Sequence, residues 1–450
     1  MFANLGRAFL VVAAIVVPPA SASPDIQHWT LANGARVYFV ETHDLPMIEF
    51  SVVFDAGSAR EPAGREGLAR ITNHMLNEGA DGLDADAIAL GFESIGAEWM
   101  AVSERDMASA GLRVLSDPAM RDPAVRLFAR ALVRPDFPEV NLERSRNEAL
   151  VVLAQKRQSP GDIAGDHFYR KLYGKHPYAH PPEGTEDSMR ALKREDLVSF
   201  HAQFYTGANA VVVLIGDLSP EAAKTLAEAI AGGLPRGAAA PPLPPVTRVP
   251  AAARGKTERI RFPSAQSHVL AGQPGMARAD ADYFPLYVGN FILGGSGLVS
   301  RLSDEIREKR GLSYSAYSYL NPMRVPGPFV LGLQTRNTQA DAALKVMRET
   351  LQRFAETGPT DVELVAAKKN ISGGFPLRLD SNRDILGYLA VIGFYGLPLD
   401  WLETYVPNVE AVTAESIRDA FRRRIRPAEM VTVVVGGDGK GDKAKAGKGR

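Results

Sequence analysis

The sequence predicts an α+β protein made of two similar halves that a linker joins. Runs rich in Val, Ile, Phe and Tyr, typical of strands, occur among longer segments with helical periodicity. A helix, a β-branched strand and a Gly/Asp turn follow one another at residues 194–217 and again at 414–438. Between these two units, residues 237–255 are rich in Pro and Ala, which is typical of an extended, semi-stiff spacer.

A chain of 450 residues is too long for one compact core, so we expect at least two domains. The expected segments are a signal peptide (1–22), an N-terminal half (23–236), the linker (237–255), a C-terminal half (256–438) and a disordered basic tail (439–450).

The N-terminus has the features of a secretory signal. Arg7 precedes an apolar run at residues 8–17, and small residues up to Ala22 provide a cleavage site. The run is shorter than the roughly 20 residues that span a bilayer, and the rest of the sequence has no longer one. We therefore expect an exported protein, periplasmic in a Gram-negative host, without a membrane span once the signal is cleaved. Retention of the signal as an anchor stays open.

The composition excludes some functions. Lys and Arg number 52 and Asp and Glu also number 52, so the basic excess typical of nucleic-acid binding is missing. The chain has no Cys, which excludes disulfides, a thiol nucleophile and cysteine-based metal sites.

The elements of the first half follow from periodicity and turn residues. Strands are expected first, then helices, and a closing helix and strand end the half. In chain order the expected ranges are 34–40 and 47–54 for strands, 65–78, 84–95, 118–132, 137–157 and 161–173 for helices, and 194–205 and 208–215 for the closing pair.

In the second half, a helix is expected to end near Arg310, because Gly311 is a natural helix stop. Residues 312–319 then alternate like a strand, and 414–421 and 430–435 form the closing helix and strand. A glycine-rich turn contains Gly294, Gly295, Ser296 and Gly297. It lacks the lysine and the preceding strand of a phosphate-binding loop, so flexibility is its default interpretation.

Residues 70–74, Arg-Ile-Thr-Asn-His, have the spacing of an inverted zincin motif without its chemistry. That motif, H-x-x-E-H, places two zinc-binding His and a general-base Glu on one helix. Here Arg70 replaces the first His and Asn73 replaces the Glu, whereas His74 remains. A guanidinium has no lone pair for a metal, and an amide cannot take a proton from water. We therefore expect no zinc in this chain. Leu68, Ile71, Met75 and Leu76 are expected to form a buried stripe on the same helix.

Four segments together resemble peptidase family M16, the family of pitrilysin and the mitochondrial processing peptidase. They are residues 67–79 around the altered motif, 176–185 (His-Pro-Tyr to Gly-Thr), 200–217, and 300–315 with Arg307 and Tyr314. They occur in the family's order and extend over nearly all of the chain after the signal.

The resemblance implies two homologous α/β-roll halves that form half of a clamshell. It also implies a zinc-free subunit that pairs with an H-x-x-E-H partner, in which zinc is expected. Arg307 and Tyr314, seven residues apart, match the positions with which such subunits bind the substrate peptide beside the partner's active site. The glycine-rich segment at 294–297 matches a loop that can contact substrate.

Some alternatives stay open. A vestigial third zinc ligand falls near Glu143 or Glu148, and Val151 is equally compatible with the register. His176 and His180 are four apart, but the prolines around them argue against a helix that would align them. A rival function is a peptide-binding or assembly scaffold with no proteolytic role.

Overall fold

A computed structural model describes residues 24–437. The expected signal peptide at 1–22 and the expected tail at 439–450 lie outside the described residues. Within residues 24–437, no helix is both long and apolar enough to cross a membrane.

The first half builds a six-stranded sheet in the order β1-β2-β8-β3-β7-β6. Strand β2 runs parallel to β8, and the other neighbours are antiparallel. The strands are β1 (Gln27–Thr30), β2 (Arg36–Glu41), β3 (Met47–Phe54), β6 (Glu98–Ser103), β7 (Ala108–Leu115) and β8 (Ala210–Gly216), with β4 (Gly79–Ala80) and β5 (Leu83–Asp84) as a separate small pair.

Helices of the first half flank this sheet and continue away from it. They are α1 (Leu68–His74), α2 (Ala85–Glu93), α3 (Pro118–Val133), α4 (Glu139–Lys156), α5 (Pro160–Tyr173), α6 (Glu186–Ala191), α7 (Arg194–Phe204) and α8 (Pro220–Ala231). Six of them, α1 to α5 and α7, match the helices expected in order, with shifted ends. The helix expected over 65–78 is shorter at both ends: it begins only at Leu68, and its last turn at Met75–Asn77 tightens to a 3₁₀ helix.

The second half has a five-stranded sheet in the order β11-β12-β10-β13-β9. Its strands are β9 (Thr257–Ile260), β10 (Gln266–Pro274), β11 (Ser313–Leu320), β12 (Pro328–Arg336) and β13 (Val431–Val435). Its helices are α9 (Tyr283–Asn290), α10 (Arg301–Ser303), α11 (Ala340–Thr357), α12 (Asp361–Gly374), α13 (Asn382–Tyr395), α14 (Trp401–Ala411) and α15 (Ala414–Arg424).

The two sheets have the same topology. If β1 is set aside, the first sheet reads β2-β8-β3-β7-β6 and the second, in corresponding order, β9-β13-β10-β12-β11. In each sheet the first and last strands of the half pair in parallel. Each last strand also leads into a glycine with positive φ, Gly216 at 138° and Gly436 at 151°, where a Cβ atom would collide with the neighbouring strand. The two expected α+β halves are therefore confirmed.

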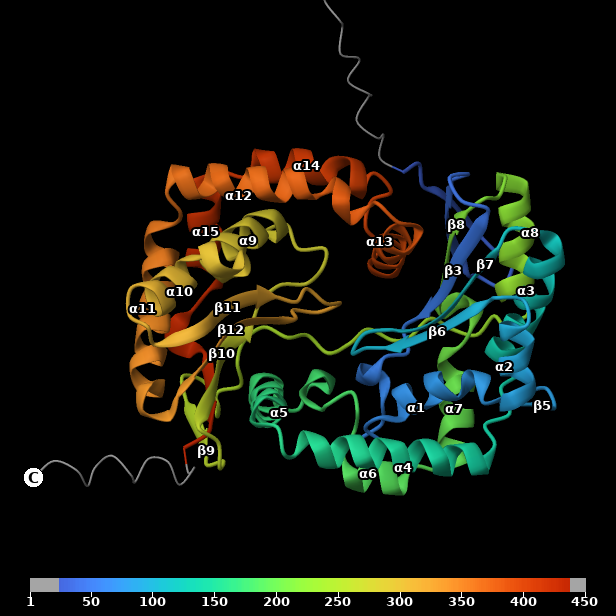
Figure 1. Cartoon of the computed structure of the whole chain (residues 1–450), viewed down its shortest axis with the longest axis horizontal. Helices are drawn as coiled ribbons and strands as arrows, with labels where there is room; N and C mark the ends of the chain where they lie inside the picture. Colours follow the sequence, from blue (N-terminus) through green and yellow to red (C-terminus); the bar gives the residue numbers. More distant parts are fainter. Residues whose placement is uncertain (1–23, 438–450) are drawn as a thin grey trace, which may run out of the picture.

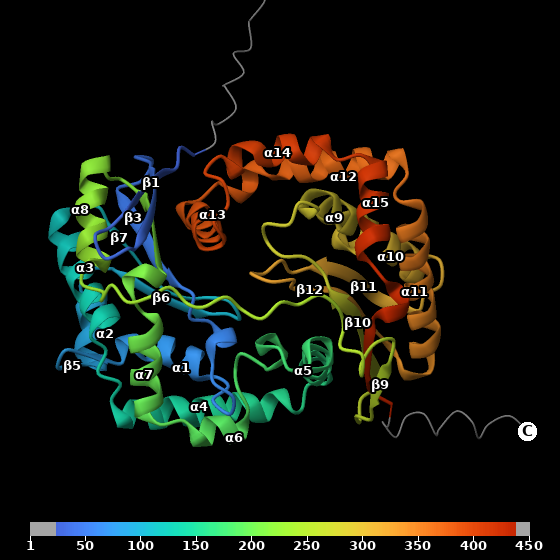
Figure 2. The ribbon, with the colours of Figure 1, turned by 180° about the vertical axis from the view of Figure 1, so that it is seen from behind.

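Each half covers the other half's sheet with one helix, which the sequence did not reveal. Helix α13 of the second half packs on β2, β3 and β8, and helix α5 of the first half packs on β10 and β13. Figures 1 and 2 show both helices beside the opposite sheet. Inward side chains such as Tyr38 and Val213 consequently belong to the core of the second half. The strands at the centre of each sheet, such as β8 and β13, are thereby buried on both faces.

The linker residues 237–255 form no helix or strand. They run along both halves: Ala240 N–H donates to Asn209 Oδ1 at 3.1 Å, and Gly255 N–H donates to the Glu429 carbonyl at 3.1 Å. Val249 is 3% exposed and packs beneath α5 with the strands of the second sheet. The segment is extended, as its prolines indicate, but it is also packed, whereas the composition suggested a spacer.

Candidate functional site

Helix α1 carries the altered zincin motif, and its apolar residues fix which side of it is buried. The expected stripe of Leu68, Ile71, Met75 and Leu76 is buried throughout. These side chains belong to the core of the first half. Arg70 and His74, one turn apart, are exposed on the other side.

Asn73 has a structural role that the motif alone did not indicate. Its side chain is only 1% exposed. The amide Nδ2 donates to the carbonyls of Val102 and Ser109 at 3.0 Å each, and Oδ1 accepts from the Tyr205 hydroxyl at 3.1 Å. Burial raises the pKa of Tyr205, so this hydroxyl keeps its proton. Asn73 therefore ties α1 to the ends of β6 and β7 and to the segment after α7.

The second half has an equivalent tie. Asn290, at the end of α9, donates from Nδ2 to the Ser318 carbonyl of β11 at 3.3 Å and accepts from the Ser318 hydroxyl at 2.8 Å. Strands β6 and β11 occupy the same place in the two sheets. The sequences also agree, since Asn73-His-Met-Leu corresponds to Asn290-Phe-Ile-Leu. Residue 73 is the general-base position of the zincin motif. It therefore holds the same anchoring Asn as position 290 in the second half, which has no zincin pattern.

A pocket of about 460 Å³ lies beside α1. Arg70, Asn73 and His74 line one side, residues 101–103 of β6 another, and residues of α4 a third. Arg70 approaches Glu183 at 3.8 Å, and Glu183 also pairs with Lys156 at 3.1 Å. Burial alone would raise the pKa of the Glu183 carboxyl, but Lys156 and Arg70 help to hold it below its ordinary value. The Glu183 carboxyl is therefore ionised, and Lys156 and Arg70 already balance its negative charge.

The open alternatives for a vestigial third ligand occupy different places. Glu148 on α4 lines the pocket, whereas Glu143 pairs with Arg146 and Val151 is exposed outside the pocket lining. His176 begins a 3₁₀ turn, and its Nε2 lies 3.0 Å from the Pro244 carbonyl of the linker. His180 lies 3.5 Å from the buried Glu61. The His176–His180 segment is thus a structural joint.

These residues do not fit a zinc ion. Arg70 is a permanent cation in the place of a ligand, and both donors and the acceptor of the Asn73 amide are already used. His74 is a single imidazole, whereas a catalytic zinc site usually has three protein ligands. Within residues 24–437, no cluster of three or more His, Cys, Asp or Glu side chains could hold a metal.

The other predicted pair comes together in the second half. Arg307 lies in a π-helical turn (Asp304–Glu308) that follows α10, and Tyr314 lies at the start of β11. Gly311 ends this helical segment as expected, with φ of 57°. The Arg307 guanidinium carbon lies 4.6 Å from the centre of the Tyr314 ring. Arg307 Nε is 3.3 Å from Glu308, its Nη1 is buried without an acceptor, and Tyr314 is 80% exposed.

The glycine-rich segment is not a simple turn. Gly294 and Gly295 belong to a π-helical continuation of α9 (Phe291–Gly295). Gly294 is buried, and a Cβ there would lie 2.4 Å from the Ser318 nitrogen, so close packing on β11 requires glycine. Gly297, with φ of 65°, begins an exposed stretch after Ser296. The expectation of plain flexibility is wrong for Gly294, which is buried against β11.

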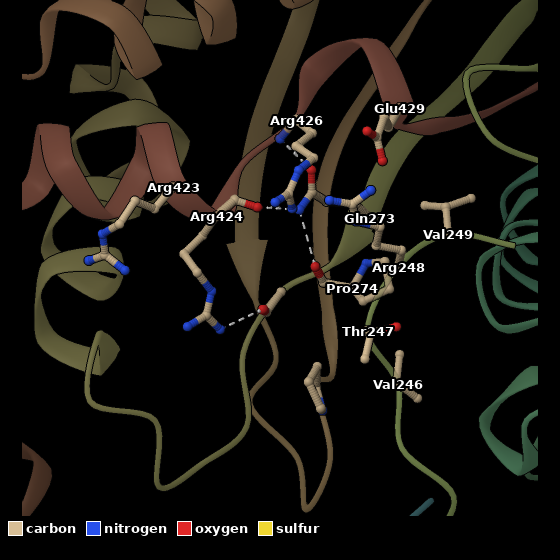
Figure 3. A pocket seen from close by; sticks show the side chains of 12 residues that line it. Val246, Thr247, Arg248, Val249, Gln273, Pro274, Arg423, Arg424, Arg426 and Glu429 are labelled. Atoms are coloured by element: carbon tan, nitrogen blue, oxygen red, sulfur yellow. Dashed lines mark hydrogen bonds between the residues drawn. The ribbon is translucent and has the colours of Figure 1, made fainter. Parts of the chain in front are cut away.

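A separate pocket of about 280 Å³ lies where the linker meets the second half (Figure 3). Its floor is Gln273, which donates to the Arg424 carbonyl at 2.8 Å and accepts from the Arg426 N–H at 2.7 Å. Arg424 also pairs with Asp280 at 2.5 Å, and Arg423 pairs with Asp282 at 2.8 Å. These bonds fasten the end of α15 to the start of α9, which indicates a structural joint.

Comparison with known proteins agrees with this geometry. Residues 36–186 match the family model described as insulinase (peptidase family M16), and residues 191–371 match the model described as the peptidase M16 inactive domain. The chain therefore belongs to peptidase family M16, and it is of the non-catalytic, M16-like type.

Individual relatives cover most of the chain. An uncharacterised zinc protease of Streptomyces coelicolor is 30% identical over 405 residues, covering 88% of this chain and 86% of that protein. A protein of Helicobacter pylori named as a non-peptidase homologue is 28% identical, covering 89% and 91%. A crystal structure from Pseudomonas fluorescens, described as a peptidase M16 inactive domain, is 38% identical with a TM-score of 0.88, covering 92% and 98%.

Proposed function

We propose that this chain is the zinc-free subunit of a two-chain M16 metallopeptidase. The partner supplies an H-x-x-E-H helix with its zinc, and this chain supplies chamber walls and groups that hold the peptide. The Arg307–Tyr314 pair of the second half, in a chain whose first half carries an altered zinc helix, is the observation that carries this proposal.

The chemistry of the pair supports peptide binding. Arg307 offers forked donors, and its stacking on Tyr314 restricts the orientation of the guanidinium. The Tyr314 hydroxyl has no hydrogen-bond partner within the described part of the chain, so it is free to donate to a peptide carbonyl. Donors of this kind stabilise the negative charge that develops on a carbonyl oxygen during hydrolysis.

We also propose that the protein works after export, in the periplasm of a Gram-negative host. The proposal rests on the composition of residues 1–22. Fractionation of cells that produce the tagged chain, with N-terminal sequencing of the mature protein, tests it. Recovery of the uncleaved chain in the cytoplasm contradicts it.

The direct test is a peptide-cleavage assay with each purified subunit and with their mixture. We expect activity in the mixture, none from this chain alone, and loss of activity with a chelator. Arg307→Ala and Tyr314→Phe should each lower kcat/KM by about tenfold to a hundredfold. The first removes a charge-assisted donor to the substrate, and the second removes a neutral donor.

Arg310→Ala is the matched control, because Arg310 lies in the same segment but pairs with Glu305 at 2.7 Å. Co-purification checks that all variants still assemble. Unchanged kinetics in both the Arg307 and Tyr314 variants would remove their proposed role. Peptide binding and assembly without any cleavage in the mixture would favour the rival function, a binding or assembly scaffold.

A further inference from the structure

The pocket beside α1 contains hydrogen-bonding groups without partners. The Arg70 side chain is 54% exposed, and its only partner within residues 24–437 is Glu183, at 3.8 Å, beyond hydrogen-bond distance. His74, one helical turn later, has no polar partner in the same part of the chain. Two donors on one helix face thus point to a common ligand.

The opposite wall adds a further unsatisfied group. Ser145 on α4 lines the pocket and is 3% exposed, yet its hydroxyl has no hydrogen-bond partner. Val102, Ala149 and Val152 provide apolar surface around it. The volume of about 460 Å³ falls within the range of about 300–1,000 Å³ that is common for ligand sites. A buried hydroxyl without a partner is unusual, so Ser145 retains an unused donor and acceptor in the wall of the pocket.

The surrounding charges favour an anion close to Arg70. Glu183 is the nearest carboxylate to Arg70, but Lys156 neutralises it at 3.1 Å. Glu148 is exposed to water and has no ion-pair partner in the described chain. Arg70 therefore retains most of its capacity to bind a carboxylate in the forked geometry that suits it, and Glu148 opposes this from the rim.

We propose that this pocket binds a peptide through a carboxylate, which Arg70 and His74 hold where active relatives would hold a metal. The ligand class is a peptide that presents either its C-terminal carboxylate or an Asp or Glu side chain. The inference rests on the peptide-binding role proposed above. It concerns the isolated chain, so it can fail while cleavage by the two-chain enzyme still depends on Arg307 and Tyr314.

The test measures fluorescence anisotropy of labelled peptides with the purified full chain. Three probes share one uncharged sequence of Gly, Ser and Leu: a free C-terminal acid, its amide, and an amide with one added Asp. At least one carboxylate probe should bind about tenfold more tightly than the plain amide, because a charge-assisted hydrogen bond typically strengthens binding by about a factor of ten. Arg70→Ala should abolish the difference, and Glu148→Gln should increase it.

Arg134→Ala is the control, because Arg134 is also exposed, at 70%, but lies outside the pocket and pairs with Asp81. It should retain the preference. Equal affinity for all three probes, absence of binding by all of them, or a preference that survives in Arg70→Ala would each overturn the proposal. Arg70 is at the surface, so loss of folding would not explain these results.

Discussion

Asn73 decides how the altered motif should be interpreted. In the sequence, Arg70, Asn73 and His74 form one group, because they occupy the three positions of the H-x-x-E-H motif of zinc proteases. In the structure only Arg70 and His74 are accessible, whereas Asn73 is buried with three hydrogen bonds. The replacement of the general base therefore stabilises the fold, and it does so through strands that are distant in sequence.

Replacement of Asn73 should destabilise the protein strongly. Asn73→Ala leaves two carbonyls and the Tyr205 hydroxyl buried without their partner, which we expect to cost about 2–4 kcal/mol of unfolding free energy. Asn73→Glu should cost at least as much, because an ionised carboxylate has no donor for the Val102 and Ser109 carbonyls. Urea denaturation measures both.

The control is Asn147→Ala on α4, where the side chain is exposed and a change within about 0.5 kcal/mol is expected. If Asn73→Glu were as stable as the original chain and also bound zinc together with Arg70→His, the structural role of Asn73 would be wrong.

At the scale of elements, the exchanged helices α5 and α13 determine how the halves are joined. Each lies on the sheet of the opposite half, so neither half has a complete core without the other. Helix α13 approaches closely at Gly393, where a Cβ would lie 2.5 Å from Val211 and 2.7 Å from Tyr38. The Gly393 carbonyl also accepts from Arg36 at 2.9 Å.

Two glycines of α13 give a matched pair of variants. Gly393→Ala should lower stability by about 1–3 kcal/mol, because the added methyl group pushes the helix away from the first sheet. Gly387→Ala, on the same helix with no atom near its Cβ, should be neutral or raise stability by up to about 1 kcal/mol. Thermal unfolding of both proteins measures the difference. Equal changes in the two variants would contradict the packing of α13 described above.

For the whole molecule, Asp106 joins the two halves through its hydrogen bonds. It accepts hydrogen bonds from Tyr178 of the first half and from Tyr395 of the second, the latter at 2.9 Å. It also accepts from the Arg324 N–H of the second half at 2.7 Å. Burial, and then the charge of Asp106, raise the pKa of both tyrosines, which therefore stay protonated as donors.

This junction predicts that the halves unfold together. Asp106→Ala should cost about 3 kcal/mol or more, because three donors lose their acceptor, whereas Tyr395→Phe removes one bond and should cost about 1 kcal/mol. Urea denaturation compares them. An Asp106→Ala variant that loses no more stability than Tyr395→Phe would show that the bonds from Tyr178 and Arg324 do not stabilise the protein.

The distribution of tryptophans allows each half to be followed separately. Trp29 and Trp99 lie in the first half and Trp401 in the second, and the chain has no other Trp. Fluorescence of Trp401→Phe reports the first half, and fluorescence of the Trp29→Phe/Trp99→Phe variant reports the second. Coincident transitions are expected, and separate midpoints would contradict a single folding unit.

The sequence by itself determined the α+β class, the two halves, many helices of the first half, the closing helix and strand of each half, and the loss of the zinc motif. These features depend on local periodicity, turn residues and the identity of single side chains, all of which are visible in one chain. It also placed Arg307 and Tyr314 on consecutive elements, which the structure brings to 4.6 Å. It did not predict β6 and β7, or β10 and β12 in the second half.

Only the tertiary structure decided which helix covers which sheet, that the linker is packed, and that Gly294 is fixed against β11. It also separated buried Asn73 from accessible Arg70 and placed Glu148, rather than Glu143 or Val151, in the pocket. Each of these depends on contacts between residues far apart in the chain. An apolar stripe shows that a helix is buried, but it does not identify the surface that buries it.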